Sequence, residues 1–356
     1  MIMDIAQMHF DVMEGKTDYI PLIINIAPKE KASITPWAAM HDPQKQIEVF
    51  LKNNENNLLF PTDRVVSIES NFLECLIPSM FGARIYSSPG GWVDVNPCID
   101  DLADFENIEV SEGVLQQAEE HLLYLKNNVP DNVHVAMTRF MAPLDCGVVM
   151  RGGDFYLDLL CEPELAMQFM EKIARVSIDT MKRLKKVVGE PDDRQMNATS
   201  GYWIKGTRLT GDSIVNVSPD VIKEMLCPVM NIFKQELGGV VLHYCCLPAP
   251  SGHVLPALAE CDGVVRAVDN WQGYKTFFNE KGDGMLQDKV GMFADFPCDE
   301  VANVEKFMEQ DIFSKVKRKG GRGFVVRTRA NTLDQAKKIY EDWQNYFAKK
   351  GMSYVG

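Results

Sequence analysis

The feature that most constrains the fold of this chain is a series of eight short apolar runs, nearly all followed by stretches with helical spacing. Each run has the length of a buried strand, and strands that alternate with helices form parallel sheets. Eight such units predict a single (β/α)8 TIM barrel over residues 1–356, with a doubly wound sheet as the alternative. The runs are Tyr19–Ile26, Asn57–Phe60, His134–Met141, Arg194–Trp203, residues 239–246, Gly263–Asp269, Val290–Phe296 and Arg322–Thr328.

Three helices between these runs are marked by end signals as well as by apolar spacing. The spacing predicts a helix over Pro163–Val188, which ends at Gly189. A second helix starts after Ser218, a good N-cap residue followed by proline, and extends to about Leu237. The last helix begins near Asn331 and carries aromatic residues that we expect to pack on the barrel.

Two segments exceed what a plain barrel needs. An N-terminal helical extension precedes the first apolar run. Residues 64–133 combine apolar patches with Pro78, Gly82, Pro89 and Pro97, so we expect an insertion of helix and short strands over the barrel mouth. The chain shows no internal repeat and no linker, which favours one domain over two.

Charge and cysteine content exclude several classes of protein. The chain has 37 Lys and Arg against 50 Asp and Glu, a formal charge of −13, so nucleic acid is not expected as a partner. No apolar run approaches the roughly 18 residues of a membrane span, and the N-terminal stretch lacks the pattern of a signal peptide. Nine scattered cysteines fit a reducing compartment better than a disulfide framework. We therefore expect a cytoplasmic protein without membrane contact.

The fifth run ends in a group of metal-binding residue types. His243, Tyr244, Cys245 and Cys246 follow the apolar residues of the run at the carboxyl end of the predicted strand. Side chains alternate along a strand, so His243 and Cys245 point to one side and Cys246 to the other. One imidazole and one thiolate suit zinc, which normally takes a third protein ligand. The competing interpretation is that these are buried packing residues.

Barrel enzymes carry their active site at the carboxyl ends of the strands, which supplies further candidates. The third metal ligand is predicted to be Cys298, at the end of the seventh run, with Asp295 as an oxygen alternative. Each remaining candidate is equally explained as an ordinary rim or core residue. The catalytic candidates are Asp212, Asp63 and Tyr202, and the substrate-binding candidates are Trp203, Asn197, Trp271 and Arg139.

Several segments together resemble the uroporphyrinogen decarboxylase superfamily, and more narrowly its cobalamin-dependent methyltransferase branch. The similarity covers nearly the whole chain, and the His-x-Cys element is its most specific part. The segments are Ser70–Ala83, Asp158–Ala166, Gly201–Ser213, Ser218-Pro219 and Leu242–Cys245.

The resemblance implies a (β/α)8 barrel in which the His-x-Cys pair and a later cysteine bind zinc. It also implies that a separate corrinoid protein carries the methyl group. The family's last cysteine follows the eighth strand, where this chain has Val326–Ala330 and no cysteine. This departure leaves Cys298 or Asp295 as the third ligand, or a site that is weak or lost.

The function expected from these observations is zinc-dependent transfer of a methyl group between a small substrate and the cobalt of a corrinoid protein. A methoxylated aromatic substrate, undergoing O-demethylation, fits Tyr202, Trp203 and Trp271, which would stack on a ring. No arginine follows the first run, so a neutral substrate fits better than a polycarboxylate. The alternatives are a cofactor-free decarboxylase of a carboxylated tetrapyrrole that uses Asp63 and Tyr202, and a non-catalytic barrel that docks a corrinoid protein. A homodimer is left open.

Overall fold

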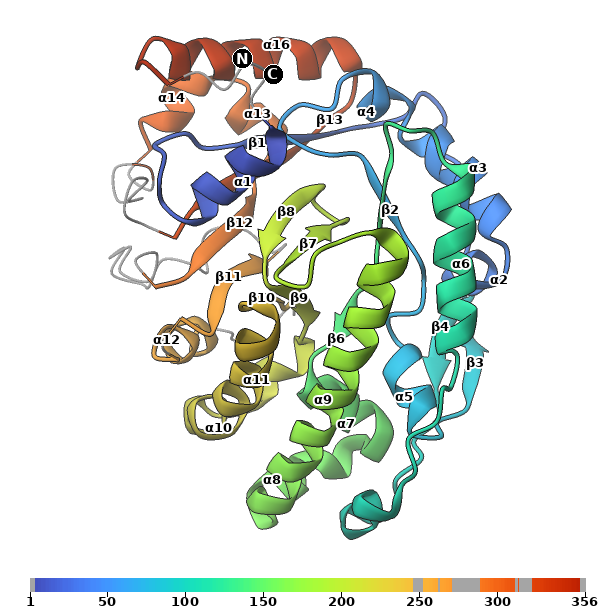
Figure 1. Cartoon of the computed structure of the whole chain (residues 1–356). Coiled ribbons are helices and arrows are strands. Elements are labelled where there is room, and N and C mark those ends of the chain that lie inside the picture. The colour runs from blue at the N-terminus through green and yellow to red at the C-terminus, as the bar shows by residue number, and fades with distance from the viewer. Residues whose placement is uncertain are drawn as a thin grey trace.

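The computed structural model describes residues 4–245, 252–261, 263–270, 289–310, 313 and 322–352 (Figure 1). Its strands are β1 (Leu22–Ile26), β2 (Ser67–Glu69), β3 (Ile85–Ser88), β4 (Trp92–Val95), β5 (His134–Ala136), β6 (Phe140–Met141), β7 (Arg194–Asn197), β8 (Tyr202–Lys205), β9 (Thr207–Thr210), β10 (Val240–His243), β11 (Val265–Asn270), β12 (Gly291–Asp295) and β13 (Phe324–Ala330).

The helices connect these strands and pack outside them. They are α1 (Ile5–Met13), α2 (Pro36–His41), α3 (Pro43–Asn53), α4 (Glu55–Leu59), α5 (Leu76–Met80), α6 (Leu115–Asn128), α7 (Pro143–Arg151), α8 (Phe155–Cys161), α9 (Pro163–Val188), α10 (Pro219–Val221), α11 (Cys227–Leu237), α12 (Val254–Ala259), α13 (Cys298–Val301), α14 (Val304–Met308) and α16 (Leu333–Ala348). Shorter helical turns are η1 (Leu102–Asn107), η2 (Gly152–Asp154), η3 (Asp212–Asn216) and the π-type turn η4 (Ile222–Leu226).

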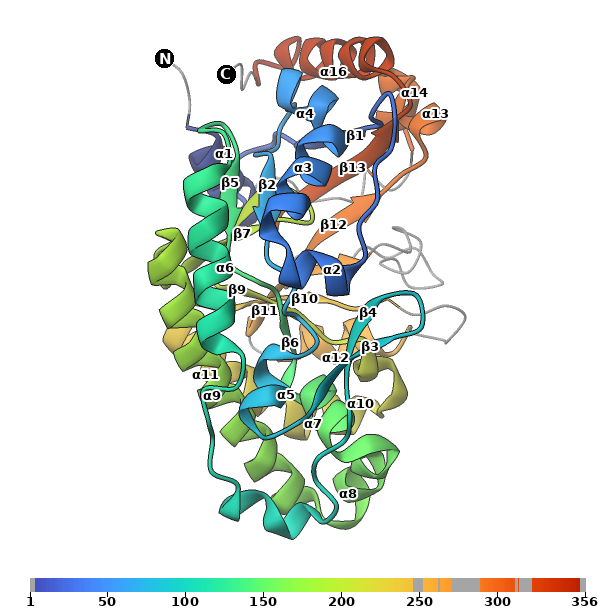
Figure 2. The same ribbon diagram turned by 90° about the vertical axis from the view of Figure 1, so that its right-hand side faces the viewer.

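A seven-stranded parallel sheet forms the centre of the structure, in the order β1-β13-β12-β11-β10-β9-β6. A second parallel pair, β2 with β5, forms a separate two-stranded sheet, and β5 is followed directly in the chain by β6 of the central sheet. Helices α6, α9 and α11 lie along the outside (Figures 1 and 2). The arrangement is compatible with the predicted TIM-like barrel. However, no ladder joins β1 to β2 among the described residues, so the sheet is not closed by backbone pairing.

The second predicted strand is wrong. Asn57 and the following leucines belong to α4, and the strand at this place in the order is β2, ten residues downstream of Asn57. The Asn57 side chain explains the error: it is buried and its amide oxygen accepts a hydrogen bond from the Ile26 backbone N–H at 2.9 Å. A short apolar run with one buried polar side chain fits a helix as well as a strand, and periodicity over four residues cannot separate them.

The fourth predicted strand is also wrong. Residues 194–203 form β7 and the start of β8, an antiparallel hairpin, and the strand that joins the central sheet is β9. Glycines make these reversals. Gly201 (φ 65°) turns the hairpin, and Gly206 (φ 90°) turns the chain into β9, with its Cα so close to the Gly239 carbonyl that a Cβ would lie 2.1 Å from that oxygen.

The β7–β8 hairpin lies between the two ends of the central sheet (Figure 1). The Val65 N–H, two residues before β2, donates to the Gly201 carbonyl at 2.8 Å. On the other side, the Tyr202 ring stacks on His9 of α1 with centroids 3.6 Å apart. The hairpin therefore supplies contacts at the seam where a closed barrel would pair β1 with β2.

The segment from 64 to 133 is only in part the predicted insertion. It contains β2 and α6, which are ordinary units of the alternating fold, and α6 packs against α9. The additions are the β3–β4 hairpin and the short helices α5 and η1. The turn of that hairpin meets α2, where the Trp37 N–H donates to the Gly91 carbonyl at 2.9 Å.

The long helices agree with the sequence. Helix α9 covers the predicted residues, with proline in its first turn and Gly189 in the left-handed conformation at its end. Helix α16 packs on β1 and β13, and the Trp343 indole N–H donates to the Ile20 carbonyl at 2.9 Å. The N-terminal extension is α1. None of the described helices is long and apolar enough to cross a membrane.

Cys227 and Cys261 form a disulfide, with their Cα atoms 5.8 Å apart. The bond links the first residue of α11 to the second residue after α12. This pair differs from the expectation that the cysteines are reduced.

Candidate metal centre

The candidate site forms where β9 and β10 end side by side. His243, the last residue of β10, pairs with Thr210, the last residue of β9. The chain continues in register, because the Gly211 N–H donates to the His243 carbonyl at 2.7 Å. Asp212 and Cys245 each lie two residues beyond the paired ends. Parallel pairing therefore brings the Asp212 carboxylate and the Cys245 thiol, 33 positions apart in the sequence, side by side just beyond the ends of the two strands.

Asp212, His243 and Cys245 form a group with the geometry of a metal site. One ligand atom from each lies within 4.8 Å of the others. The His243 Nε2 and the Cys245 Sγ are 3.2 Å apart, and an Asp212 carboxylate oxygen accepts from the Cys245 backbone N–H at 2.6 Å. Ligands of one tetrahedral zinc lie roughly 3.5 Å apart, so the present spacing needs little adjustment to fit the ion.

The orientation of His243 suits metal binding. Its Nδ1 lies 2.6 Å from the Asp269 backbone carbonyl, which can only accept, so Nδ1 carries the proton and donates. Nε2 then has its lone pair directed to the side of Cys245. Burial, assisted by the charge of Arg208, lowers the pKa of His243 to about 4. The ring is neutral at pH 7, as a metal-binding histidine must be. Its Nδ1 is held by the hydrogen bond to the Asp269 carbonyl of the neighbouring strand β11.

Asp145 in α7 holds the loop that carries Asp212. Its carboxylate accepts from the Ser213 N–H at 3.0 Å, and burial raises its pKa to about 7. Gly211 leaves little room for a larger residue here, since a Cβ would lie 3.0 Å from a methyl carbon of Leu242. Packing and one hydrogen bond thus fix the Asp212 carboxylate beside β10.

A buried ionic cluster lies directly behind the triad. The Asp269 carboxylate, fully buried in β11, pairs with Arg327 at 2.5 Å and with Arg208 at 3.1 Å. Arg327 also pairs with Asp295 at 2.6 Å. Burial raises the pKa of Asp269, but the two guanidinium groups outweigh it and hold that pKa well below the usual range. The cluster fixes β9, β11, β12 and β13 next to the triad.

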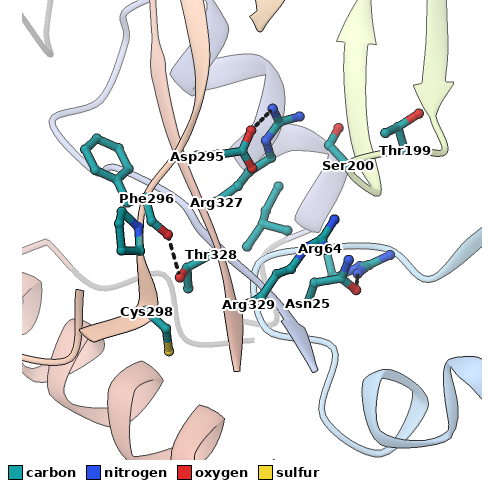
Figure 3. Close-up of a pocket in the computed structure, with 12 residues that line it drawn as sticks. Asn25, Arg64, Thr199, Ser200, Asp295, Phe296, Cys298, Arg327, Thr328 and Arg329 are labelled. Carbon is teal, nitrogen blue, oxygen red and sulfur yellow. Dashed lines mark hydrogen bonds and ion pairs between the residues drawn. The ribbon is translucent and has the colours of Figure 1, made fainter. Parts of the chain in front are cut away.

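Cys298 and Asp295, the predicted third ligands, lie elsewhere. Both line a cavity between β1, β12 and β13, in which Asp295 pairs with Arg327. Figure 3 shows the Cys298 sulfur directed away from the labelled polar groups. The group of three ligands found in the described part of the chain contains Asp212 in their place. Asp212, predicted to act on the leaving group, is thus a candidate ligand.

Two predicted catalytic residues are not at the carboxyl ends of the strands. The Asp63 carboxylate, 3% exposed, accepts from the Leu22 N–H at the start of β1 and from the hydroxyls of Tyr19 and Tyr340. Tyr202 is fully buried, and its hydroxyl donates to the His9 carbonyl at 3.2 Å. Both lie by α1 and the amino ends of the strands, which corrects the positions assigned to them from the sequence.

The predicted substrate-binding residues are dispersed. The Trp203 ring packs against His134 at the start of β5, with centroids 4.9 Å apart. Asn197 is buried, and its amide group donates to the Asp269 carboxylate at 3.4 Å. Arg139 pairs with a glutamate of β2 at 2.6 Å. Trp271 and Cys246 lie outside the described residues.

Sequence reasoning missed Asp212 as a ligand and Arg208 as part of the cluster. Both follow from one error, the assignment of the fourth strand to residues 194–203. With the strand placed at β9, alternation directs Arg208 and Thr210 to the same side, and Asp212 follows the strand end beside His243. Gly206 before the strand and Gly211 after it were the available signals.

Comparisons with known proteins support the fold. The structure is similar to a methyltransferase from Methanosarcina mazei, with a TM-score of 0.62 and 14% sequence identity, over 96% of this chain and 99% of that one. No family model matches the chain, and no curated protein matches it by sequence. At this identity the likeness concerns the fold alone. The resemblance to the uroporphyrinogen decarboxylase superfamily stays a prediction.

Proposed function

We propose that the chain is a metal-dependent methyltransferase whose metal is a zinc ion held by Asp212, His243 and Cys245. The observation that carries the proposal is the convergence of these three side chains at the carboxyl ends of β9 and β10. The fold, shared with a methyltransferase from Methanosarcina mazei, is consistent with it.

The donor set suits zinc in a catalytic role. A thiolate and an imidazole favour zinc over magnesium or calcium, and three protein ligands leave one tetrahedral position for a substrate atom. Bound there, zinc would supply Lewis acidity, which lowers the pKa of a coordinated oxygen or sulfur. The Asp269 carbonyl keeps the His243 Nε2 lone pair available, and the Cys245 backbone N–H orients the Asp212 carboxylate.

The methyl group would pass between a small substrate and the cobalt of a corrinoid protein. This part of the proposal rests on the His-x-Cys element and the segments that resemble corrinoid-dependent methyltransferases. We favour removal of a methyl group from a methoxylated aromatic. A decarboxylase reaction lacks comparable support, because Asp63 and Tyr202, the residues it would use, are buried against α1 and the amino end of β1.

Metal analysis of the purified protein tests the site. We expect about one zinc per chain in the wild type and its loss in Cys245→Ser and Asp212→Asn. Cys298→Ser is the matched control, because it removes a thiol that lies outside the triad. Absence of zinc from the wild type, or unchanged zinc in Cys245→Ser, would contradict the metal assignment.

A second experiment tests the reaction. The protein would be incubated with methoxylated aromatics and reduced cobalamin, and formation of methylcobalamin would be followed by its absorbance. We expect methylation with wild-type protein and its loss in Cys245→Ser. Methylation that proceeds equally in both proteins would refute a role for the triad in methyl transfer.

A further inference from the structure

A cavity of about 400 Å³ opens between β1, β12, β13 and the tip of the β7–β8 hairpin. It lies beyond the buried ionic cluster, since Arg327 contacts Asp295 in the cavity wall with one nitrogen and Asp269 with another. The Asp269 carbonyl in turn holds His243. The cavity and the triad are therefore linked by hydrogen bonds through Arg327 and Asp269. Its polar lining includes Asn25, Arg64, Ser200, Asp295, Arg327 and Arg329 (Figure 3).

The lining carries three arginines and one carboxylate. Arg327 is paired with Asp269 and Asp295, so its charge is compensated. Arg64 and Arg329 lie together with Asn25 on the side of the cavity away from that pair (Figure 3). No ion pair to a carboxylate is found for either of them in the described part of the chain. This side of the cavity has an excess of positive charge.

Arg64 is the unusual member because it is as buried as Arg327 but has no carboxylate partner within the described residues. It is 6% exposed, and its hydrogen bond is from Nη1 to the Asn25 amide oxygen, at 3.0 Å. Its Nε has no hydrogen-bond partner within the described residues. Burial lowers the pKa of Arg64 to about 10, so the group is still charged at pH 7. Burying a cation without an anion costs several kcal/mol, and a bound anion would offset that cost.

The fold itself holds Arg64 in this place. Gly201 at the hairpin tip packs against it, and a Cβ on Gly201 would lie 3.2 Å from the Arg64 Cβ and 2.4 Å from the Val65 carbonyl oxygen. The hairpin at the seam of the sheet therefore fixes one wall of the cavity. A guanidinium group fixed in this way presents a planar fork that matches a carboxylate.

We propose that this cavity binds the carboxylate group of a small organic acid through Arg64 and Arg329. Resting on the proposed function, the ligand would be the methyl substrate, a methoxylated aromatic acid. The sequence had suggested a neutral substrate because no arginine follows the first strand. The arginines instead come from the segment before β2 and from β13, which the fold brings to β1.

Calorimetric titration with 4-methoxybenzoate, methoxybenzene and inorganic phosphate tests the proposal. We expect the acid to bind and the neutral ether to bind at least about tenfold more weakly, because the ether lacks the carboxylate and loses at least one charged hydrogen bond. Arg64→Gln and Arg329→Gln should each weaken binding of the acid about ten- to a hundredfold. Arg183→Gln, a surface arginine paired with Glu112 and Glu119, is the control and should bind like the wild type.

Thermal unfolding with and without the acid provides a second measurement. A saturating ligand should raise the midpoint of the wild type, and the shift should be clearly smaller in Arg64→Gln at the same ligand concentration. Arg329→Gln changes an exposed side chain, so it tests the cavity even if Arg64→Gln fails to fold. Equal affinity for acid and ether, unchanged binding in both variants, or binding of phosphate without the acid would overturn the proposal.

Failure of the proposed reaction is distinguishable from failure of the cavity. Cys245→Ser should lose zinc and methyl transfer yet still bind the acid in preference to the neutral ether, because Arg64 and Arg329 line the cavity and Cys245 does not. Acid binding without methyl transfer in the wild type would contradict the reaction and leave the carboxylate site established.

Discussion

Replacing Asp269 by asparagine tests how far the buried cluster stabilises this fold. Asp269 is fully buried and its two oxygens neutralise Arg327 and Arg208, which are 6% and 0% exposed. Asparagine keeps the size of the side chain but removes the charge, which leaves Arg208 buried without a carboxylate. Breaking a buried ion pair in this way costs about 3–5 kcal/mol.

Asp295→Asn is the matched control. It also removes a partner of Arg327, at 2.6 Å, but the Asp295 side chain is 40% exposed and Arg327 keeps Asp269. Exposed ion pairs contribute up to about 1 kcal/mol. Urea unfolding at pH 7 should therefore show a loss of unfolding free energy several times larger for Asp269→Asn than for Asp295→Asn. The dependence of that free energy on urea concentration should be the same in both variants.

A double variant sharpens the test. In Arg208→Met with Asp269→Asn the buried unpaired cation is gone, so we expect it to be more stable than Asp269→Asn alone. The pKa of Asp269 is held below its usual range by Arg327 and Arg208 against the effect of burial. Its contribution is present above the unfolded pKa, near 4, and is lost as the pH falls. Equal losses for the two single variants at pH 7, or a double variant no more stable than Asp269→Asn, would refute the reasoning.

Three further predictions concern other buried groups. Burial raises the pKa of Asp63 from 3.8 to about 6, so the contribution of Asp63 to the free energy of unfolding declines as the pH rises from about 4 to 6. Over that range, unfolding experiments should show the wild type losing about 3 kcal/mol of stability relative to Asp63→Asn. Gly206→Ala should cost more than about 2 kcal/mol by urea unfolding because its Cβ meets the Gly239 carbonyl, whereas Gly189→Ala, in the left-handed conformation with no atom closer than 3.7 Å, should cost about 1 kcal/mol. Lys185→Met should destabilise the protein by about 2 kcal/mol, since three backbone carbonyls lose their donor; equal stability would contradict this.

The sequence alone determined the elements that depend on local pattern. Helix α9 has its apolar spacing, its initial proline and its final glycine within one stretch, and the structure has the same bounds. The pairing of His243 with Cys245 also follows locally, because residues two apart in an extended segment share a side. The five strands with continuous apolar runs from β10 onward and at β1 were placed within a few residues.

Only the tertiary structure decided which distant residues complete the site. Asp212 lies beside His243 and Cys245 as a candidate ligand because β9 pairs with β10 in a register that no local pattern encodes. The same is true of Arg64, which donates a hydrogen bond to Asn25 of β1 and lines one cavity with Arg329 of β13 only in the folded chain. Hydrophobic periodicity reports which face of a segment is buried, not which segment lies next to it, and a metal or anion site consists of such neighbours.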